Sequence, residues 1–232
     1  MKRASTFFTD GDRTAIETAV ASAEKRTSAE IISVVATASG RYDRAEDVFG
    51  IVVAIATLCA VWIAFPGGSI GDGWLAGGPP ASAGGGPAFG LAGAIAAIVV
   101  GFAAGAALAT RFPALCTPFA SKAEMREEVE RAANEAFFAF RVRSTAEATG
   151  ILLYISLYER MVRVVGDDAI ASKLGQGDWD EIRDRVIAGL ADGGAAAGLV
   201  GAIERCGELC AAHFPRAEDD GNELSNELRI ID

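Results

Sequence analysis

The sequence predicts an α/β fold: a mixed sheet flanked by helices and interrupted by a two-helix transmembrane hairpin. Of the 21 basic and 31 acidic residues in the 232-residue chain, only Asp72 lies within residues 48–110. On both sides of that block, helical patterns alternate with short β-branched runs, which is typical of α/β domains. We therefore divide the chain into an N-terminal helix and strand, a hairpin, the remainder of the same domain and an acidic tail: residues 1–47, 48–110, 111–216 and 217–232.

The hairpin is predicted from two apolar runs, residues 48–65 and 89–110, which contain no Asp, Glu, Lys, Arg or His. As helices they would be about 27 and 33 Å long, close to the roughly 30 Å of hydrocarbon in a bilayer. Two buried helices of a large soluble core are the alternative, and the complete absence of charge disfavours it. The first predicted partner is therefore the lipid bilayer.

The orientation follows from the positive charges around these runs. The connector, residues 66–88, is rich in Gly, Pro and Ser and is predicted to be a loop without Lys or Arg. In contrast, Arg41 and Arg44 precede the first run, and Arg111 and Lys122 follow the second. The positive-inside rule predicts a multi-pass protein of the cytoplasmic (inner) membrane with both termini in the cytoplasm.

Small residues recur at every fourth position of the second run. Such a stripe lets another helix approach closely, and it favours packing against the first run of the same chain, with homodimerisation as the alternative. The stripe consists of Gly93, Ala97, Gly101 and Gly105, and Ala109 continues it.

Before the hairpin, Thr9 or Asp10 is predicted to cap a helix that ends near Arg26, and residues 30–37 form a β-branched strand. One helix and one strand cannot bury enough surface to be stable alone. Their partners must therefore come from beyond the hairpin.

The remaining elements follow the second run. A nearly continuous apolar strand is typical of a sheet covered on both faces. It is followed by a turn at Tyr158–Arg160 and a returning strand, and Asp192–Gly194 separates the last two helices. The predicted elements are a helix over 121–143, strands over 151–157 and 161–165, a short helix over 169–174, a helix from about 178, and a helix over 195–213.

Composition restricts the partners and the redox state. A net charge of −10 excludes a nucleic-acid binder, which needs a basic face to displace counterions. A cytoplasmic domain faces a reducing compartment, so Cys116, Cys206 and Cys210 are expected to be free thiols. The acidic tail offers Leu224 and Leu228, with Ile230 and Ile231, as docking points.

Several short motifs follow one another in a characteristic order: residues 25–31, 149–156 with Glu159 and Arg160, 164–168, 178–181, 206–209 and 222–224. In this order they resemble the TPM-domain family, also called the TPM phosphatase family, and in particular small bacterial members with a transmembrane hairpin inserted in the domain. The resemblance implies a Rossmann-like mixed sheet flanked by helices. It also implies links to acid phosphatase chemistry, divalent-cation binding or membrane-complex maintenance.

Four aspartates are the candidate metal ligands. Asp167 and Asp168 follow a strand end, where open α/β sheets bind ligands, and Asp178 and Asp180 begin a helix. Carboxylates are preferred ligands of Mg²⁺ or Ca²⁺. Capping of the helices that follow is the competing interpretation for all four.

Other catalytic arrangements are weakly supported. Cys206, Cys210 and His213 share one helix face but lack an evident fourth zinc ligand. No Gly-x-Ser-x-Gly elbow or Asp-x-Asp motif follows an apolar strand. Over an enzyme, the sequence therefore favours a membrane-anchored interaction or maintenance module that recruits partners, such as membrane proteins, or binds a divalent cation. The alternative is a metal-dependent phosphatase of low specificity.

Overall fold

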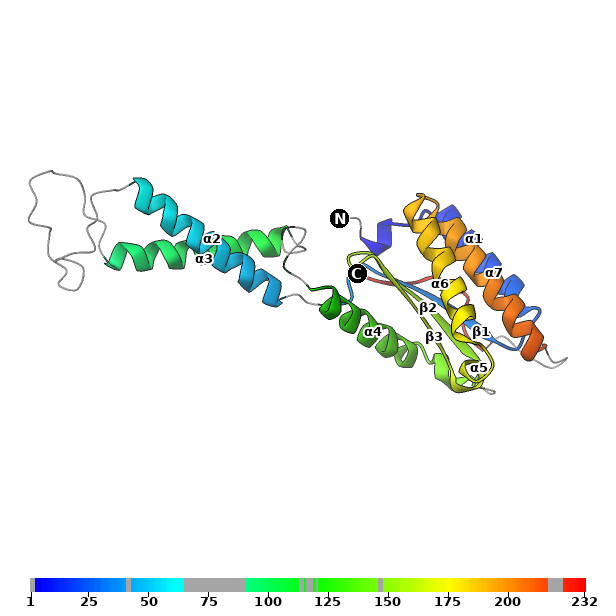
Figure 1. Cartoon of the computed structure of the whole chain (residues 1–232). Coiled ribbons are helices and arrows are strands. Elements are labelled where there is room, and N and C mark those ends of the chain that lie inside the picture. The colour runs from blue at the N-terminus through cyan, green and yellow to red at the C-terminus, as the bar shows by residue number, and fades with distance from the viewer. Residues whose placement is uncertain are drawn as a thin grey trace, which may run out of the picture. The chain divides into compact units, whose positions relative to one another are not determined.

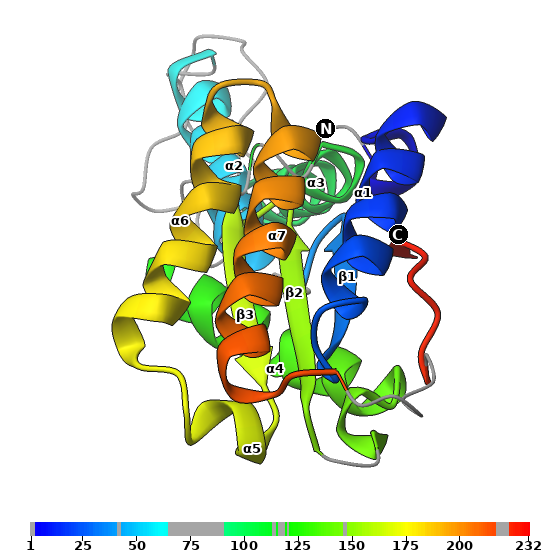
Figure 2. The same cartoon turned by 90° about the vertical axis from the view of Figure 1, so that its right-hand side faces the viewer.

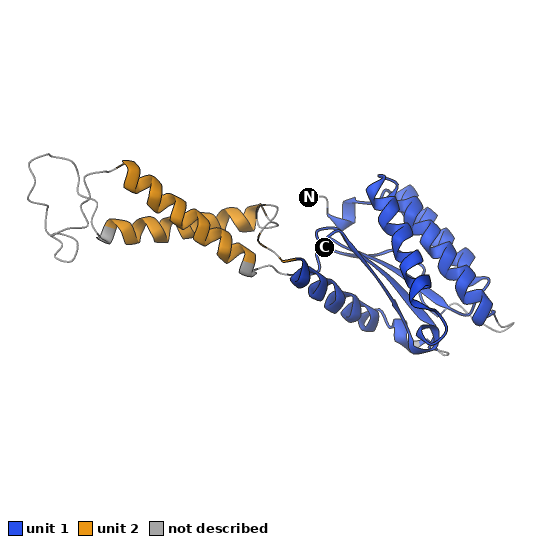
Figure 3. Cartoon of the chain, in the orientation of Figure 1, with its two compact units in different colours: residues 1–40, 122–232 blue, residues 41–121 orange. Residues whose placement is uncertain are grey.

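The computed structural model describes residues 3–40, 43–64, 91–112, 115, 119, 121–145, 148–216 and 223–232. Arg41, Asp72, Cys116 and the predicted connector at 66–88 lie outside these residues, as does the side chain of Arg44. Two compact units make up the chain (Figure 3). Residues 1–40 and 122–232 form the α/β unit, and residues 41–121 form the hairpin unit.

The α/β unit is built on one mixed sheet of four strands in the order β3-β2-β1-β4. β1 runs parallel to β2 and to β4, whereas β3 is antiparallel to β2. Every residue of β1 and β2 is buried, as expected for central strands covered on both faces, so both strand predictions are confirmed. The strands are β1 (Glu30–Ala36), β2 (Gly150–Ser156), β3 (Met161–Gly166) and β4 (Arg229–Ile231).

Three α-helices, α1, α6 and α7, cover one face of this sheet together with the 3₁₀ turn η1 (Figures 1 and 2). A capping box between Thr9 and Asp12 starts α1, as the sequence predicts. In the larger core of the unit, Ile31, Ile151 and Ile155 of the sheet pack with the apolar side chains of these helices. The covering elements are η1 (Ala4–Thr6), α1 (Asp10–Glu24), α6 (Gln176–Ala191) and α7 (Ala195–His213).

The opposite face is covered by α4 (Lys122–Ala139). Val129, Ala133 and Phe137 pack against Leu152 and Tyr154 in a second, smaller core. Residues adjacent in a strand point to opposite faces, so β2 contributes to both cores. The helix ends before the predicted Arg143, because Arg141 adopts a left-handed backbone (φ 58°) and the 3₁₀ turn η4 (Val142–Ser144) follows.

The C-terminal residues belong to the sheet. β4 pairs Ile230 with Val35, and Leu228 is 5% exposed in the larger core. The sequence predicts apolar docking points in this tail but no strand, because three residues are too short to show a strand period. α5 (Asp168–Ala171), a single turn, connects β3 to α6.

The hairpin unit contains α2 (Asp43–Ala64) and α3 (Leu91–Arg111). Residues 45–64 and 93–111 are long and apolar enough to cross a membrane. Large apolar side chains point outward, including Ile55 (57% exposed) and Val100 (64% exposed). α2 begins upstream of Val48, because the acidic residues before the apolar run lie in its first turns, where the helix dipole favours negative charge.

Candidate functional site

Asp167 and Asp168 lie where β3 ends and α5 begins. Asp167 is 4% exposed and caps α5, accepting a hydrogen bond from the Asp168 backbone N–H at 2.8 Å. Its second oxygen, Oδ2, is buried without a hydrogen-bond partner among the described residues. The Asp168 side chain points to solvent and approaches Arg143 Nη2 at 3.6 Å.

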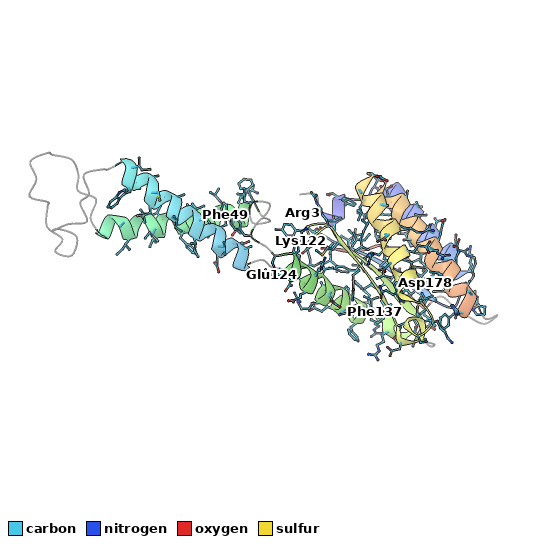
Figure 4. The ribbon with its side chains drawn as sticks, viewed as in Figure 1. Arg3, Phe49, Lys122, Glu124, Phe137 and Asp178 are labelled. Atoms are coloured by element: carbon cyan, nitrogen blue, oxygen red, sulfur yellow. The ribbon has the colours of Figure 1, made fainter. Side chains whose placement is uncertain are left out.

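Asp178 and Asp180 lie in the first turns of α6 (Figure 4 labels Asp178). Asp178 accepts the Gly175 backbone N–H at 2.9 Å, which closes the N-terminus of the helix. Asp180 accepts from Arg183 at 2.6 Å and from Gln176 at 3.2 Å. Asp178 therefore has the capping role of the competing interpretation, whereas Asp180 forms an ion pair with Arg183.

The four aspartates are thus placed in two pairs at the starts of two helices. In the part of the chain that the structure describes, no three His, Cys, Asp or Glu side chains are grouped to hold a metal ion. A cation here would take its oxygens from one pair and from water. Metal binding by these residues stays a prediction.

The cysteines of α7 are buried and separated from the exposed His213. Cys206 and Cys210 are free thiols with no exposed surface. Burial raises the pKa of Cys206 well above its usual value and raises the pKa of Cys210 to about 12. Because the thiolate is the reactive form, these two side chains act as small apolar core residues.

A buried polar cluster lies at the carboxyl ends of β1 and β2, and we call it the edge cluster: Ser39, Tyr154, Ser156 and Glu159. Glu159 is 6% exposed, and its carboxylate accepts the backbone N–H groups of Ser39 at 2.9 Å and Gly40 at 3.3 Å, as well as the Ser156 hydroxyl. Ser39 Oγ donates to Ser156 Oγ at 2.8 Å and lies 3.1 Å from the Tyr154 hydroxyl.

The edge cluster is the feature that sequence reasoning missed. The predicted turn at Tyr158–Arg160 is confirmed, but Glu159 is not one of its solvated residues. The cluster holds the segment that follows β1 and leads to α2, because the Glu159 carboxylate accepts hydrogen bonds from the backbone of both Ser39 and Gly40. An acidic residue three positions after a nearly continuous apolar strand was the available signal.

A second buried carboxylate, Glu24, lies at the other end of β1. It accepts the Ile31 N–H at 3.0 Å, and the neighbouring Glu30 accepts the N–H groups of Glu223 and Leu224 at 3.1 and 3.3 Å. Burial, reinforced by the negative charge of Glu30, raises the pKa of Glu24 to about 7. The Glu30 carboxylate at this end of β1 therefore holds the C-terminal segment at Glu223 and Leu224.

The small residues of α3 lie on its covered side. Gly101, Gly105 and Ala109 are buried, and Gly93 and Ala97 are half-buried. A Cβ added at Gly101 would lie 2.8 Å from Ala54 Cα, and one at Gly105 would lie 2.9 Å from Gly50 Cα, so α2 and α3 meet backbone to backbone. This is the approach that small residues permit between membrane helices.

These observations define a class of protein: an α/β domain with a four-stranded mixed sheet, split by an insertion of two apolar helices. Residues 121–209 match the sequence pattern of the TPM domain. Over these residues the chain matches the TPM domain, which confirms the resemblance drawn from its motifs.

The fold has a counterpart among solved structures. The NMR structure of BA42 protein from the psychrophilic bacterium Bizionia argentinensis is similar to this chain, with a TM-score of 0.55 and 18% identity. The similarity covers 99% of each chain. It shows that the two proteins share a fold. A comparison with curated proteins gives no match.

Proposed function

We propose that this protein is a membrane-anchored TPM domain that acts as an interaction or maintenance module on the cytoplasmic side of the inner membrane. One observation carries the proposal. β1 precedes the two apolar helices and β2 follows them, yet the two strands pair along their whole length, from Glu30–Gly150 to Ala36–Ser156. If α2 and α3 span a bilayer, this pairing requires both flanking segments to lie on one side.

Labelling of single cysteines in intact cells tests the anchoring and the orientation. Cys59, Cys116, Cys206 and Cys210 are first replaced by Ala, and one cysteine is introduced by Ser82→Cys in the connector or Ser225→Cys near the C-terminus. A membrane-impermeant maleimide should label only the Ser82→Cys protein, and disruption of the cells should make the Ser225→Cys protein reactive. Labelling of Ser225→Cys in intact cells, or recovery of the chain in the soluble fraction, contradicts the proposal.

The interaction role is supported by the hydrogen bonds of two candidate ligands. Asp178 caps the N-terminus of α6 and Asp180 pairs with Arg183, so both carboxylates already have structural roles. A photo-cross-linking residue at exposed Glu204 of α7 should yield a discrete adduct with another membrane protein in native membranes. The alternative, a phosphatase, predicts Mg²⁺-dependent hydrolysis of a phosphomonoester by the purified protein. Hydrolysis that disappears in an Asp167→Ala/Asp168→Ala variant would replace the interaction role with the enzyme.

Cation binding is the second part of the proposal and is favoured by the unpartnered Oδ2 of Asp167. Asp167 and Asp168 would supply carboxylate oxygens, and water would complete the shell, since Mg²⁺ usually keeps several waters. Calorimetric titration of the full chain with Ca²⁺ and Mg²⁺ should give a saturable signal that Asp167→Asn/Asp168→Asn removes. The control Asp184→Asn, an exposed acid on α6, should retain it. An equal signal in both variants contradicts binding at this position.

A further inference from the structure

A pocket of about 630 Å³ opens at the carboxyl end of β2. Ser156 and Leu157 at the end of that strand and residues from the last turns of α6 contribute to its lining. Phe7, directly after η1, and Arg160 from the β2–β3 turn complete the lining. The volume lies within the roughly 300–1,000 Å³ typical of small-molecule sites.

The walls of this pocket are apolar. Besides Phe7 and Leu157, the lining includes Ile187, Leu190 and Ala191 of α6. Ile187 is 41% exposed, although it is a large apolar side chain beside the core. An apolar group that entered from solvent would cover this exposed surface and gain the free energy of its removal from water.

Arg160 gives the pocket a single charge. Within the described part of the chain its guanidinium makes no ion pair, whereas Arg163 three residues later pairs with Glu130 at 2.8 Å. The backbone of Arg160 is left-handed (φ 54°), a conformation that is unfavourable for a residue other than glycine. A charged residue is thus held in a strained turn at the rim of an apolar cavity.

Arg160 is the one charged side chain among the described residues that line the pocket. Asp192, the C-cap of α6, directly follows the lining residue Ala191, but it is exposed to solvent and is not part of the lining. Glu159 is hydrogen-bonded to Ser39, Gly40 and Ser156 and is also absent from the lining. A guanidinium binds carboxylate and phosphate groups through two parallel hydrogen bonds.

We propose that this pocket binds a single-chain anionic lipid, with the acyl chain between Phe7 and Leu190 and the carboxylate or phosphate group on Arg160. The pocket itself does not depend on the membrane anchor, but the supply of such lipids rests on the function proposed above. Ser39 and Gly40, which precede α2 in the chain, are hydrogen-bonded to Glu159 at this same edge of the sheet.

Methyl NMR of the full chain in phosphatidylcholine nanodiscs tests the proposal with octanoate and octyl phosphate, and octanol as the uncharged control. Both anions should shift the Ile187 and Leu190 methyl signals saturably, and octanol should bind at least about tenfold more weakly. Saturation by one anion alone identifies the carboxylate or the phosphate as the recognised group. Equal binding of octanol, or no shift at Ile187, overturns the proposal.

Matched variants separate recognition from folding. Arg160→Gly removes the guanidinium and suits the left-handed backbone, so it should fold and bind both anions at least about tenfold more weakly. Arg160→Lys keeps the positive charge but loses the two parallel hydrogen bonds of the guanidinium, so it should bind the anions with intermediate affinity. Arg163→Ala should bind like the unchanged protein. Unaltered binding by Arg160→Gly contradicts the assignment, whereas the cysteine-labelling result for the anchor is independent of it.

Discussion

Two of the buried glutamates in the α/β unit, Glu24 and Glu159, are stabilised to different degrees. Glu159 accepts two backbone N–H groups and a hydroxyl, which compensates a carboxylate for its loss of water. Glu24 accepts the Ile31 N–H, has one oxygen without a hydrogen-bond partner in the described part of the chain, and lies near Glu30. Burial therefore raises the pKa of Glu24 to about 7, because the hydrogen bonds from Ile31 and Asn226 and the positive charge of Arg216 offset only part of its effect.

Replacement of this carboxyl should make the fold more stable at neutral pH. The folded pKa of Glu24, about 7, is above its ordinary 4.5, so its contribution to stability is present below pH 4.5 and is lost as pH rises through 7. Glu24→Gln should therefore stabilise the protein by about 2 kcal/mol at pH 8 and change little at pH 4.5. Chemical unfolding followed by circular dichroism between pH 4.5 and 8 measures this difference.

Glu204→Gln is the control, because Glu204 is exposed on α7 and its replacement should leave the pH profile unchanged. A Glu24→Gln variant with the slope of the unchanged protein between pH 4.5 and 7 would show that burial does not shift this group.

At the scale of elements, the pairing of α2 with α3 depends on small residues at their contact. The covered face of α3 carries Gly101 and Gly105, and the facing residues of α2 are Gly50 and Ala54. Membrane helices gain little from the hydrophobic effect on association, since lipid is as apolar as their side chains. If α2 and α3 span a bilayer, close packing is therefore the main source of affinity between them.

A larger side chain at the closest approach should separate these helices. Gly101→Leu places atoms where Ala54 and Thr57 already lie within 3 Å of a Cβ, so it should destabilise the hairpin by about 1–3 kcal/mol. Ala103→Leu, on the exposed side of α3, should be nearly neutral. Unfolding of both variants by SDS titration in mixed micelles compares them, and equal midpoints would contradict this pairing.

At the scale of the whole molecule, the α/β unit has its own cores. The two clusters of buried apolar residues contain none from 41–121. The two ends of the chain at the insertion are also close, because a Cβ added at Gly40 would lie 2.6 Å from Glu128 Cγ on α4. The insertion is therefore expected to be dispensable for folding of the sheet.

Replacement of residues 41–121 by eight Gly and Ser residues should give a soluble, folded domain. Glu128 lies about 9 Å along α4 from Lys122, and eight linker residues can span more than about 25 Å. Circular dichroism and a dispersed amide NMR spectrum would establish the fold, and size-exclusion chromatography the monomer. An aggregated product without spectral dispersion would show that the hairpin is needed for the sheet to form.

The predictability of the site differs from residue to residue. Thr9 could be assigned as a cap because its signal is local, and the strands 151–157 and 161–165 because their period and turn are local. The edge cluster could not be predicted, since Ser39 and Glu159 are 120 positions apart and meet only through the pairing of β1 with β2. β4 was missed because its three residues are strand-like only beside β1.

The sequence by itself determined that an uncharged block of two apolar runs divides the chain and that α/β elements lie on both sides. Those properties depend on composition and on periods of a few residues. Only the tertiary structure decided that β1 and β2 are neighbours, that Glu24 and Glu159 are buried, and that Arg160 lines an apolar pocket. Burial and charge pairing depend on which distant segments meet, and the pattern of one segment does not contain that information.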